Sequence, residues 1–589
     1  MGPEQRDERR PARSKALAGV CLAALTAALA HGQGSQARFV DRVDVNVGNV
    51  EVTVQDKNGN IISGLTRDDF LLYVNGKLRE IEYFGAYSRR APGLAESPGE
   101  AGATAADAGI PEAPTPPRQR RVQVIFVDSA NTTVFNRNHI LGRVAEYVRR
   151  TVRPPDLAMV AVYENSLRIA SPLTSNADEI AYLLEELRKD TANVGGHSMY
   201  RAMAERQIRD LAERQTQEQA VRAVILDQAI VTARMAAQQI RDHTEQTVGA
   251  FKLLLRTMSG VEGRKSVLYV SDGLPRTPGL ETFQLLTEFF PQARMGDTEF
   301  QSYETTQLWQ ELARWAVGAD VTFYTIDARG LKAGAEKSAE HGRHPPSVRT
   351  AGNRPVFGDL EVLHLQNYQD PLIAMANVTG GITVINTNEF DRGLERIAEA
   401  METYYSLGFP LGSSNHDVYH DIRVELRDRS DLRLRYRTGL LERSLAMRMA
   451  DRAYAGLTFG VLENPLAIRA VLGTPSPAGK KRYTLPVKVL VPVDKIALLP
   501  AGEEYRGKVT VWTVAAGAVN KLSPLNRQEH EIVVPADKMS RLGTLAIELT
   551  VEVPEGDCRV SVAVLDEATG EVGFAAADAR LGPEAKRRG

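Results

Sequence analysis

The chain has 589 residues, of which 43% are hydrophobic and 25% are charged, which is an ordinary composition for a globular protein. At about 100–200 residues per domain, this length predicts roughly three or four folded units. Lysine and arginine number 72 and acidic residues number 74, so the net charge of −2 leaves no positive excess for binding nucleic acid or an anionic membrane. The two cysteines, Cys21 and Cys558, exclude a disulfide scaffold and a metal site built from cysteines.

Residues 1–30 have the order of a signal peptide. A basic start is followed by the small and apolar run Ala16 to Ala30, which as a helix would measure about 22 Å, less than the roughly 30 Å of a membrane core. Ala28 and Ala30 supply the small residues that a signal peptidase requires before its cleavage site. We therefore expect cleavage near Ala30 and an exported mature chain (periplasmic, on the cell surface or secreted) with no transmembrane segment. An uncleaved membrane anchor is the alternative.

Strand patterns occur near both ends of the mature chain. Residues 43–85 alternate apolar and polar side chains and contain the turn signal Asn75-Gly76, which predicts an N-terminal β domain. The hairpin 416–440 alternates in the same way, and we expect it to join that domain. Residues 86–120 are rich in proline, alanine and glycine and predict a disordered linker. Residues 453–582 are strand-rich again, which predicts a C-terminal β-sandwich.

Residues 121–410 predict an α/β domain, because apolar strand patterns alternate with segments of helical spacing. This alternation is typical of a doubly wound, mainly parallel sheet. Residues 198–259 contain no proline and are rich in alanine, glutamine, arginine and glutamate, which predicts a long helical insertion. The apolar strand patterns lie at 122–127, 157–163, 266–271 and 321–326.

Polar residues that could bind a metal follow two of these strands. Asp128 ends the first strand and is followed by Asn131 and Thr132, and Asp272 follows a later strand. In open α/β sheets, ligands bind at the carboxyl ends of the strands. Carboxylate and hydroxyl oxygens suit a hard divalent cation such as Mg²⁺. We expect both aspartates to share one ion and to lie outside the apolar core; their alternative role is ordinary loop capping.

Common catalytic motifs are missing from the sequence, which contains no dinucleotide fingerprint, Walker A sequence, HExxH motif or paired CxxC. The segment Gly196-His197-Ser198-Met199-Tyr200 resembles a nucleophile elbow, GxSxG, but tyrosine replaces its last glycine. A predicted helix and loop precede it, whereas the elbow requires a preceding strand. A hydrolase with its site near Ser198 is therefore the disfavoured alternative, and we expect a protein without enzymatic activity.

Six segments have an order and spacing that together are specific. They are Val52 to Gly59 (VTVQDKNG), Gly64 to Phe70 (GLTRDDF), Gly263 to Gly273 (GRKSVLYVSDG), Thr325 to Leu331 (TIDARGL), Thr379-Gly380-Gly381, and Tyr404 to Phe409 (YYSLGF). On these segments, residues 121–405 resemble a von Willebrand factor A (VWA) domain, and residues 43–440 resemble the bacterial VWFA-related domain family of acidobacterial type. The resemblance implies a Rossmann-like α/β core with flanking β domains.

The resemblance also implies an adhesion function that depends on Mg²⁺ or Mn²⁺. VWA domains hold the ion with a D-x-S-x-S loop, a distant threonine and a distant aspartate. Asp128, Thr132 and Asp272 match three of these positions. Ala130 replaces the middle serine, and His197 stands at the threonine position, so the site is degenerate, with Asn131 or Ser198 as substitute ligands. The expected partner is a protein or a cell-envelope component, and a metal-free structural scaffold of the envelope is the alternative.

Overall fold

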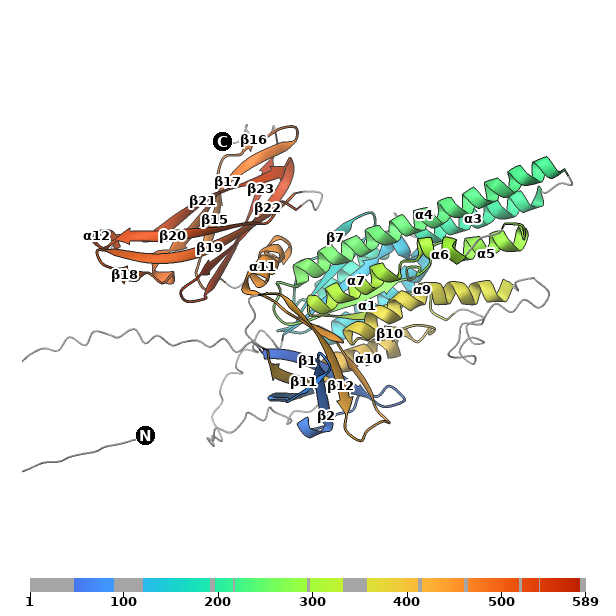
Figure 1. Ribbon diagram of the computed structural model, residues 1–589, viewed down its shortest axis with the longest axis horizontal. Coiled ribbons are helices and arrows are strands. Elements are labelled where there is room, and N and C mark those ends of the chain that lie inside the picture. Colours follow the sequence, from blue (N-terminus) through green and yellow to red (C-terminus); the bar gives the residue numbers. More distant parts are fainter. Residues whose placement is uncertain are drawn as a thin grey trace, which may run out of the picture. The chain divides into compact units, whose positions relative to one another are not determined.

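The computed structural model describes residues 47–88, 120–190, 196–214, 218–293, 297–331, 357–411, 416–459, 464–517, 522–539 and 541–582. The predicted signal peptide lies outside these ranges, as do residues 89–119 of the predicted linker. The described chain is a mixed α/β structure with several sheets (Figure 1), and one six-stranded sheet contains the parallel strands.

The six-stranded sheet has the strand order of a doubly wound fold. Its strands lie in the order β10-β9-β8-β5-β6-β7, and neighbours are parallel except for β6 and β7. Because β5 has β6 on one side and β8 on the other, the strand order reverses between β5 and β8. The strands are β5 (Arg121–Asp128), β6 (Leu157–Tyr163), β7 (Leu167–Ile169), β8 (Arg264–Ser271), β9 (Val321–Asp327) and β10 (Thr383–Val384).

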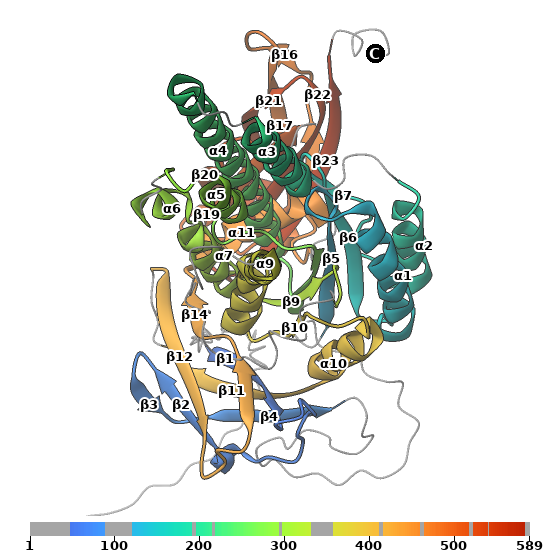
Figure 2. The ribbon, with the colours of Figure 1, turned by 90° about the vertical axis from the view of Figure 1, so that its right-hand side faces the viewer.

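Helices cover both faces of this sheet, because successive strand residues point to opposite sides. Ile125 and Val127 of β5 pack in one apolar layer with α1, α2 and α10, and Val124 and Phe126 pack in the other layer with α4, α7 and α9. Figure 2 shows the two sets of helices on opposite sides of the strands. These helices are α1 (Val134–Thr151), α2 (Ala177–Leu187), α4 (Gln219–Met258), α7 (Thr306–Gly318), α9 (Phe357–Thr379) and α10 (Phe390–Glu402).

The segment 198–259 forms two long helices, α3 (Gly196–Glu213) and α4. Alanines of α4 pack against α3 and against α5 (Leu280–Phe289), since Ala229 and Ala233 share a buried cluster with Ile208 and Phe283. A short helix, α6 (Asp297–Tyr303), follows α5. Among the described residues, no helix combines the length and the apolar character needed to cross a membrane.

Two four-stranded sheets pack together around the residues expected in the N-terminal β domain. One has the order β13-β1-β11-β4 and the other the order β14-β12-β2-β3, and their inward side chains form one apolar cluster. Asn75 and Gly76 have φ angles of 51° and 74°, which form the tight turn between β2 and β3. The strands are β1 (Val47–Gln55), β2 (Phe70–Val74), β3 (Lys77–Arg79), β4 (Tyr83–Ser88), β11 (Thr403–Pro410), β12 (Val418–Leu426), β13 (Arg433–Tyr436) and β14 (Gly439–Glu442).

Three boundaries differ from those expected from the sequence. Residues 403–410, assigned to the α/β domain, form β11 and pair with β1, because Tyr405, Leu407 and Phe409 point into the β cluster at a spacing of two. Residues 86–88, assigned to the linker, end β4. Residues 453–459, assigned to the C-terminal sandwich, belong to the helix α11 (Leu445–Phe459).

The described strands between residues 469 and 581 form two antiparallel sheets that share one apolar cluster, which is the arrangement of a β-sandwich. β17 pairs with β15, β16 and β21 in one sheet, and β19 pairs with β18, β20 and β22 in the other. Cys558 is buried in β22. The strands are β15 (Arg469–Leu472), β16 (Ser476–Pro477), β17 (Arg482–Pro492), β18 (Leu499–Ala501), β19 (Glu504–Gly517), β20 (Asn526–Pro535), β21 (Thr544–Pro554), β22 (Gly556–Asp566) and β23 (Val572–Leu581).

Candidate functional site

Three aspartates stand at one edge of the six-stranded sheet. β5 ends at Asp128, β8 is followed by Asp272, and β9 ends at Asp327. The three strands are parallel, so their carboxyl ends lie at the same edge, beside the reversal of strand order. The predicted residues Asp128 and Asp272 therefore share this edge, but their surroundings differ.

The Asp128 carboxylate is fully buried, and both of its oxygens accept hydrogen bonds. Oδ1 accepts from the backbone N–H of Asn131 at 3.1 Å and from the Asn131 Nδ2 at 2.9 Å. Oδ2 accepts from the hydroxyls of Tyr269 at 2.6 Å and Ser271 at 3.2 Å, and again from the Asn131 Nδ2 at 2.9 Å. Burial raises the pKa of Asp128 to about 6, although the bonds from Tyr269, Asn131 and Ser271 lower it. The expectation that Asp128 lies outside the core is therefore wrong.

Thr132 and Asn131 are both buried beside Asp128. The Thr132 hydroxyl donates to the backbone carbonyl of Asp128 at 2.6 Å. The Asn131 Nδ2 also donates to the Thr247 hydroxyl of α4 at 3.2 Å. The Asn131 Oδ1 is a buried acceptor for which the described residues provide no donor. Asn131 thus holds Asp128 with its amide nitrogen and keeps its amide oxygen available to a neighbouring group.

Asp272 is partly exposed and receives its hydrogen bonds from the start of α1. Its Oδ2 accepts from the backbone N–H of Thr133 at 2.9 Å, and its two oxygens accept from the Asn136 Nδ2 at 3.0 and 2.9 Å. Burial raises the pKa of Asp272 to about 6, while the bonds from Thr133 and Asn136 and the positive charge of Arg329 lower it. Asp272 therefore carries an acidic group with a raised pKa at the surface of the sheet edge.

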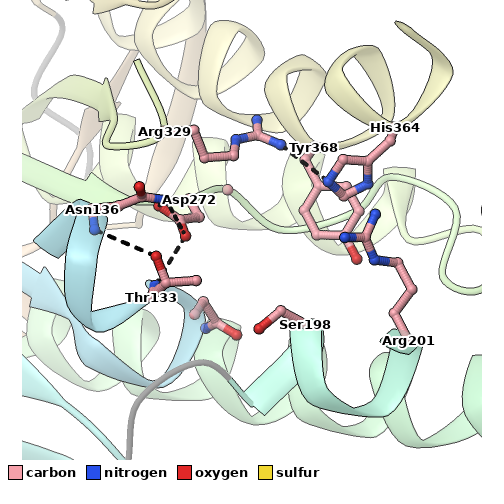
Figure 3. Close-up of a pocket in the computed structure, with 10 residues that line it drawn as sticks. Thr133, Asn136, Ser198, Arg201, Asp272, Arg329, His364 and Tyr368 are labelled. Atoms are coloured by element: carbon pink, nitrogen blue, oxygen red, sulfur yellow. Dashed lines mark hydrogen bonds between the residues drawn. The ribbon is translucent and has the colours of Figure 1, made fainter. Parts of the chain in front are cut away.

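A cavity of about 90 Å³ opens beside Asp272. Figure 3 shows that its walls come from elements far apart in the sequence: α1 supplies Asn136, α3 supplies Ser198 and Arg201, and α9 supplies His364 and Tyr368. Asp128 and Thr132 do not line it, whereas Asp272, Asn131 and Ser198 do. The complete lining is Asn131, Thr133, Asn136, Ser198, Arg201, Asp272, Gly273, Arg329, His364 and Tyr368.

A chain of hydrogen bonds fixes the upper wall of this cavity. The Arg329 guanidinium donates to both carboxylate oxygens of Asp327, at 2.8 Å each, and its Nη1 lies 3.4 Å from the His364 Nε2. The His364 Nδ1 lies 3.1 Å from the Glu281 Oε1. Because arginine can only donate, Nε2 accepts and Nδ1 carries the proton. Burial lowers the pKa of His364, against the effect of Glu281, and this favours the neutral ring.

The arrangement does not fit an ion shared by Asp128 and Asp272. Groups that donate hydrogen bonds occupy the Asp128 oxygens, so a cation there would meet N–H and O–H groups in place of free lone pairs. Within the described ranges, no three histidine, cysteine, aspartate or glutamate side chains gather as metal ligands. The shared Mg²⁺ or Mn²⁺ ion stays a prediction of the sequence.

Sequence reasoning missed most of the cavity. Arg329 follows β9 as Asp272 follows β8, so its position at a strand end was a usable signal. His364 and Tyr368 are four residues apart, which places them on one helix face, but nothing in the sequence indicates that this face meets α3. The position His197 lies at the start of α3, and its side chain is outside the described part of the chain.

No family model and no curated protein matches the chain. Similar solved structures include a von Willebrand factor type A protein from Catenulispora acidiphila, with 11% identity and a TM-score of 0.20 over 92% of this chain and 76% of that one. An aerotolerance-related membrane protein from Bacteroides fragilis (9% identity) and the conserved hypothetical protein BatB from Bacteroides thetaiotaomicron (10% identity) each have a TM-score of 0.20 over 48% of this chain and 98% of theirs. At such scores the likeness carries no functional conclusion, and the description of the fold rests on the strand order.

Proposed function

We propose that the chain is an exported VWA-type binding protein without enzymatic activity, which recognises a protein or a cell-envelope component through the cavity beside Asp272. One observation carries the proposal: a charged cavity opens at the carboxyl edge of a doubly wound sheet, next to the reversal of strand order. Ligands bind at this position in open α/β sheets. The sequence resemblance to VWA domains supports recognition at the same edge.

The size and chemistry of the cavity favour one end group of a larger partner. A volume of about 90 Å³ is well below the roughly 300–1,000 Å³ of sites that enclose a small-molecule ligand. Asp272 can accept hydrogen bonds from an ammonium or guanidinium group, and Arg201 can donate to a carboxylate. Both residues line the same cavity, so we expect a charged side chain of the partner to enter it.

The bonds around His364 weigh against a hydrolase near Ser198. A serine nucleophile needs a neighbouring base with an unoccupied ring nitrogen. The His364 Nε2 faces the Arg329 guanidinium and its Nδ1 faces Glu281, so both nitrogens are already engaged. The metal-free scaffold remains the alternative, and it differs from our proposal because it leaves the cavity without a ligand.

Capture of a partner from envelope extracts tests the proposed function. The full-length chain is immobilised as wild type, as Asp272→Asn and as Asp178→Asn, whose exposed carboxylate on α2 does not line the cavity. We expect the wild type and Asp178→Asn to retain the same partner, and Asp272→Asn to retain at least about tenfold less of it, a loss of roughly 1.4 kcal/mol of binding free energy. Equal capture by all three proteins would reject the cavity as the site, and specific capture by none would favour the scaffold.

Two further measurements test the remaining parts of the proposal. Calorimetric titration with Mg²⁺ and Mn²⁺ tests the ion that the sequence predicts: saturable heat that disappears in Asp272→Asn would support it, and the absence of saturable heat would reject it. Residues 1–30 lie outside the described part, so export stays a prediction. N-terminal sequencing of the exported protein is expected to begin near His31, and a sequence that begins at Met1 would reject cleavage.

A further inference from the structure

Helix α3 contributes side chains to the cavity and, separately, to a second and more apolar concave surface. Ser198 and Arg201 line the cavity, whereas Met199 and Met203 line a groove of about 920 Å³ between α3 and α4. The two methionines are 52% and 64% exposed, although thioethers of this kind are usually buried. Figure 1 shows α3 and α4 as adjacent helices. One helix thus presents polar groups to the cavity and apolar groups to a groove.

Helix α4 carries an exposed apolar stripe along the same groove. Its positions 221, 224, 228, 231 and 235 are spaced three, four, three and four residues apart, which is the a/d spacing of a coiled coil. Valine or methionine occupies four of them, with exposed fractions between 37% and 57%, and Gln228 occupies the central one. The core of the domain takes a different stripe of α4, which includes Ile225, Ala229 and Ala233. The exposed stripe therefore does not belong to this buried cluster, and its spacing suits contact with a helical partner.

We propose that this stripe pairs with the same stripe of a second copy of the chain, α4 against α4 in antiparallel orientation, to form a homodimer. In the register that sets Gln228 beside Val231 of the second copy, Met235 meets Val224 of the second copy. The two Gln228 side chains then flank the two-fold axis, where a polar pair fixes the register of a coiled coil. The methionines of α3 form the outer wall of the resulting four-helix contact.

Charge complementarity selects this orientation. Asp227 and Arg234 flank the stripe at equivalent positions seven residues apart. In the antiparallel register each Asp227 faces Arg234 of the second copy, so the contact contains two opposite-charge pairs. A parallel register would set Asp227 against Thr232 and leave both charges unpaired across the contact. Arg234 bonds Glu299 through Nε and Nη2, and its half-exposed guanidinium keeps Nη1 on its other edge.

Composition argues against the segments that flank α3 or precede α9 as the occupant. Residues 191–195 (TANVG) and 215–217 (QTQ), which flank α3, together contain one large aliphatic residue, Val194. Residues 332–356 contain Val348 and Val356 as their only large aliphatic residues. None of these segments can supply an apolar side chain every three or four residues, whereas a second α4 supplies the complementary pattern by symmetry.

Sedimentation velocity of the full-length chain between about 1 and 100 μM tests the proposal. We expect a species of twice the 64.6 kDa chain mass that dissociates on dilution. Val231→Glu is expected to raise the dimer dissociation constant at least tenfold. The matched control is Val533→Glu in β20, because Val533 is also an exposed valine (44%) and lies outside the groove. Circular dichroism confirms the fold of each variant.

A charge exchange sharpens the test. Asp227→Arg sets two arginines against each other and is expected to weaken the dimer at least tenfold, and the double variant Asp227→Arg, Arg234→Asp is expected to recover it to within about threefold. A wild-type chain that stays monomeric at the highest concentration would overturn the proposal, and so would a dimer that Val231→Glu leaves intact. A dimer that Val231→Glu breaks but the double variant does not recover would reject the antiparallel register.

Discussion

β5 and β8 are adjacent parallel strands whose carboxyl ends carry one aspartate each, yet the two carboxylates have different neighbours. Asp128 is enclosed by donors from Asn131, Tyr269 and Ser271 and has no exposed surface. Asp272 is partly exposed and borders the cavity. Equivalent positions in one sheet therefore have different roles. We infer that the Asp128 carboxylate stabilises the sheet edge and that the Asp272 carboxylate is available to a partner.

Removal of the Asp128 carboxylate should have the largest effect on stability. Asp128→Ala leaves the hydroxyls of Tyr269 and Ser271 and the amide of Asn131 without their buried acceptor, and each such loss costs about 1–3 kcal/mol. We expect the free energy of unfolding to fall by about 4 kcal/mol in urea denaturation. Asp272→Ala is the matched control, since water can reach the Thr133 and Asn136 donors, and equal losses in the two variants would contradict the contrast.

The pH dependence of stability should fall next in size. The pKa of Asp128 is about 6 in the folded chain, whereas an aspartate without such interactions has a pKa of 3.8. At pH values between these two, the folded state therefore binds more protons than the unfolded state. Stability must then decrease as the pH rises from below 4 to above 6, by roughly 3 kcal/mol for this group. The difference in unfolding free energy between wild type and Asp128→Asn should shrink by most of that amount between pH 4 and pH 7, and a constant difference would contradict the raised pKa.

The sequence was sufficient for the positions of the two aspartates but not for their environments. Strand ends are recognisable because apolar runs such as Val122 to Val127 stop at a polar residue, and the parallel order follows from alternation with helices. The sequence around Tyr269 is an apolar run and predicts a core residue. Its hydroxyl donates to Asp128 only because β8 lies directly beside β5. Long-range pairing of this kind is not encoded in local periodicity.

The residues of the cavity were even harder to predict from local sequence patterns than the surroundings of the two aspartates. Arg201, Arg329 and His364 come from three elements separated by more than a hundred residues at the widest, and they meet because α3 and α9 both cover the carboxyl edge of the sheet. β11 shows how local sequence can assign a segment to the wrong domain. It comes directly after the helix α10, so its residues were assigned to the α/β domain, and only its pairing with β1 places them in the β domain. Local patterns predicted the elements, and the contacts between elements determined the site.

Removal of one donor to Asp128 should produce a moderate change. Tyr269→Phe keeps the ring in its packing position and deletes the 2.6 Å hydrogen bond to the Asp128 Oδ2. We expect a loss of about 1.5 kcal/mol in the free energy of unfolding, the lower end of the range for a hydrogen bond to a charged group. Because the Tyr269 bond lowers the pKa of Asp128, its loss should raise that pKa further and move the decrease of stability to higher pH. A pH profile that moves to lower pH would contradict the role of Tyr269 as a donor.

The smallest effect on stability should come from Asp272→Asn, although its effect on partner capture is expected to be large. The new amide oxygen can still accept from the Thr133 backbone N–H, and rotation of the Asn136 amide presents an oxygen to the new NH₂ group. Because Asp272 is partly exposed, water can satisfy any remaining group, and we expect the free energy of unfolding at pH 7 to change by less than about 1 kcal/mol. The substitution also removes a carboxyl whose pKa of about 6 lies above its value in an unfolded chain, so the variant should gain stability relative to wild type as the pH rises from 4 to 7. Urea denaturation at both pH values measures this directly. If the free energy of unfolding fell as far as in Asp128→Ala, Asp272 would also be a residue that stabilises the sheet edge. Such a result would contradict the proposal that it is available to a partner.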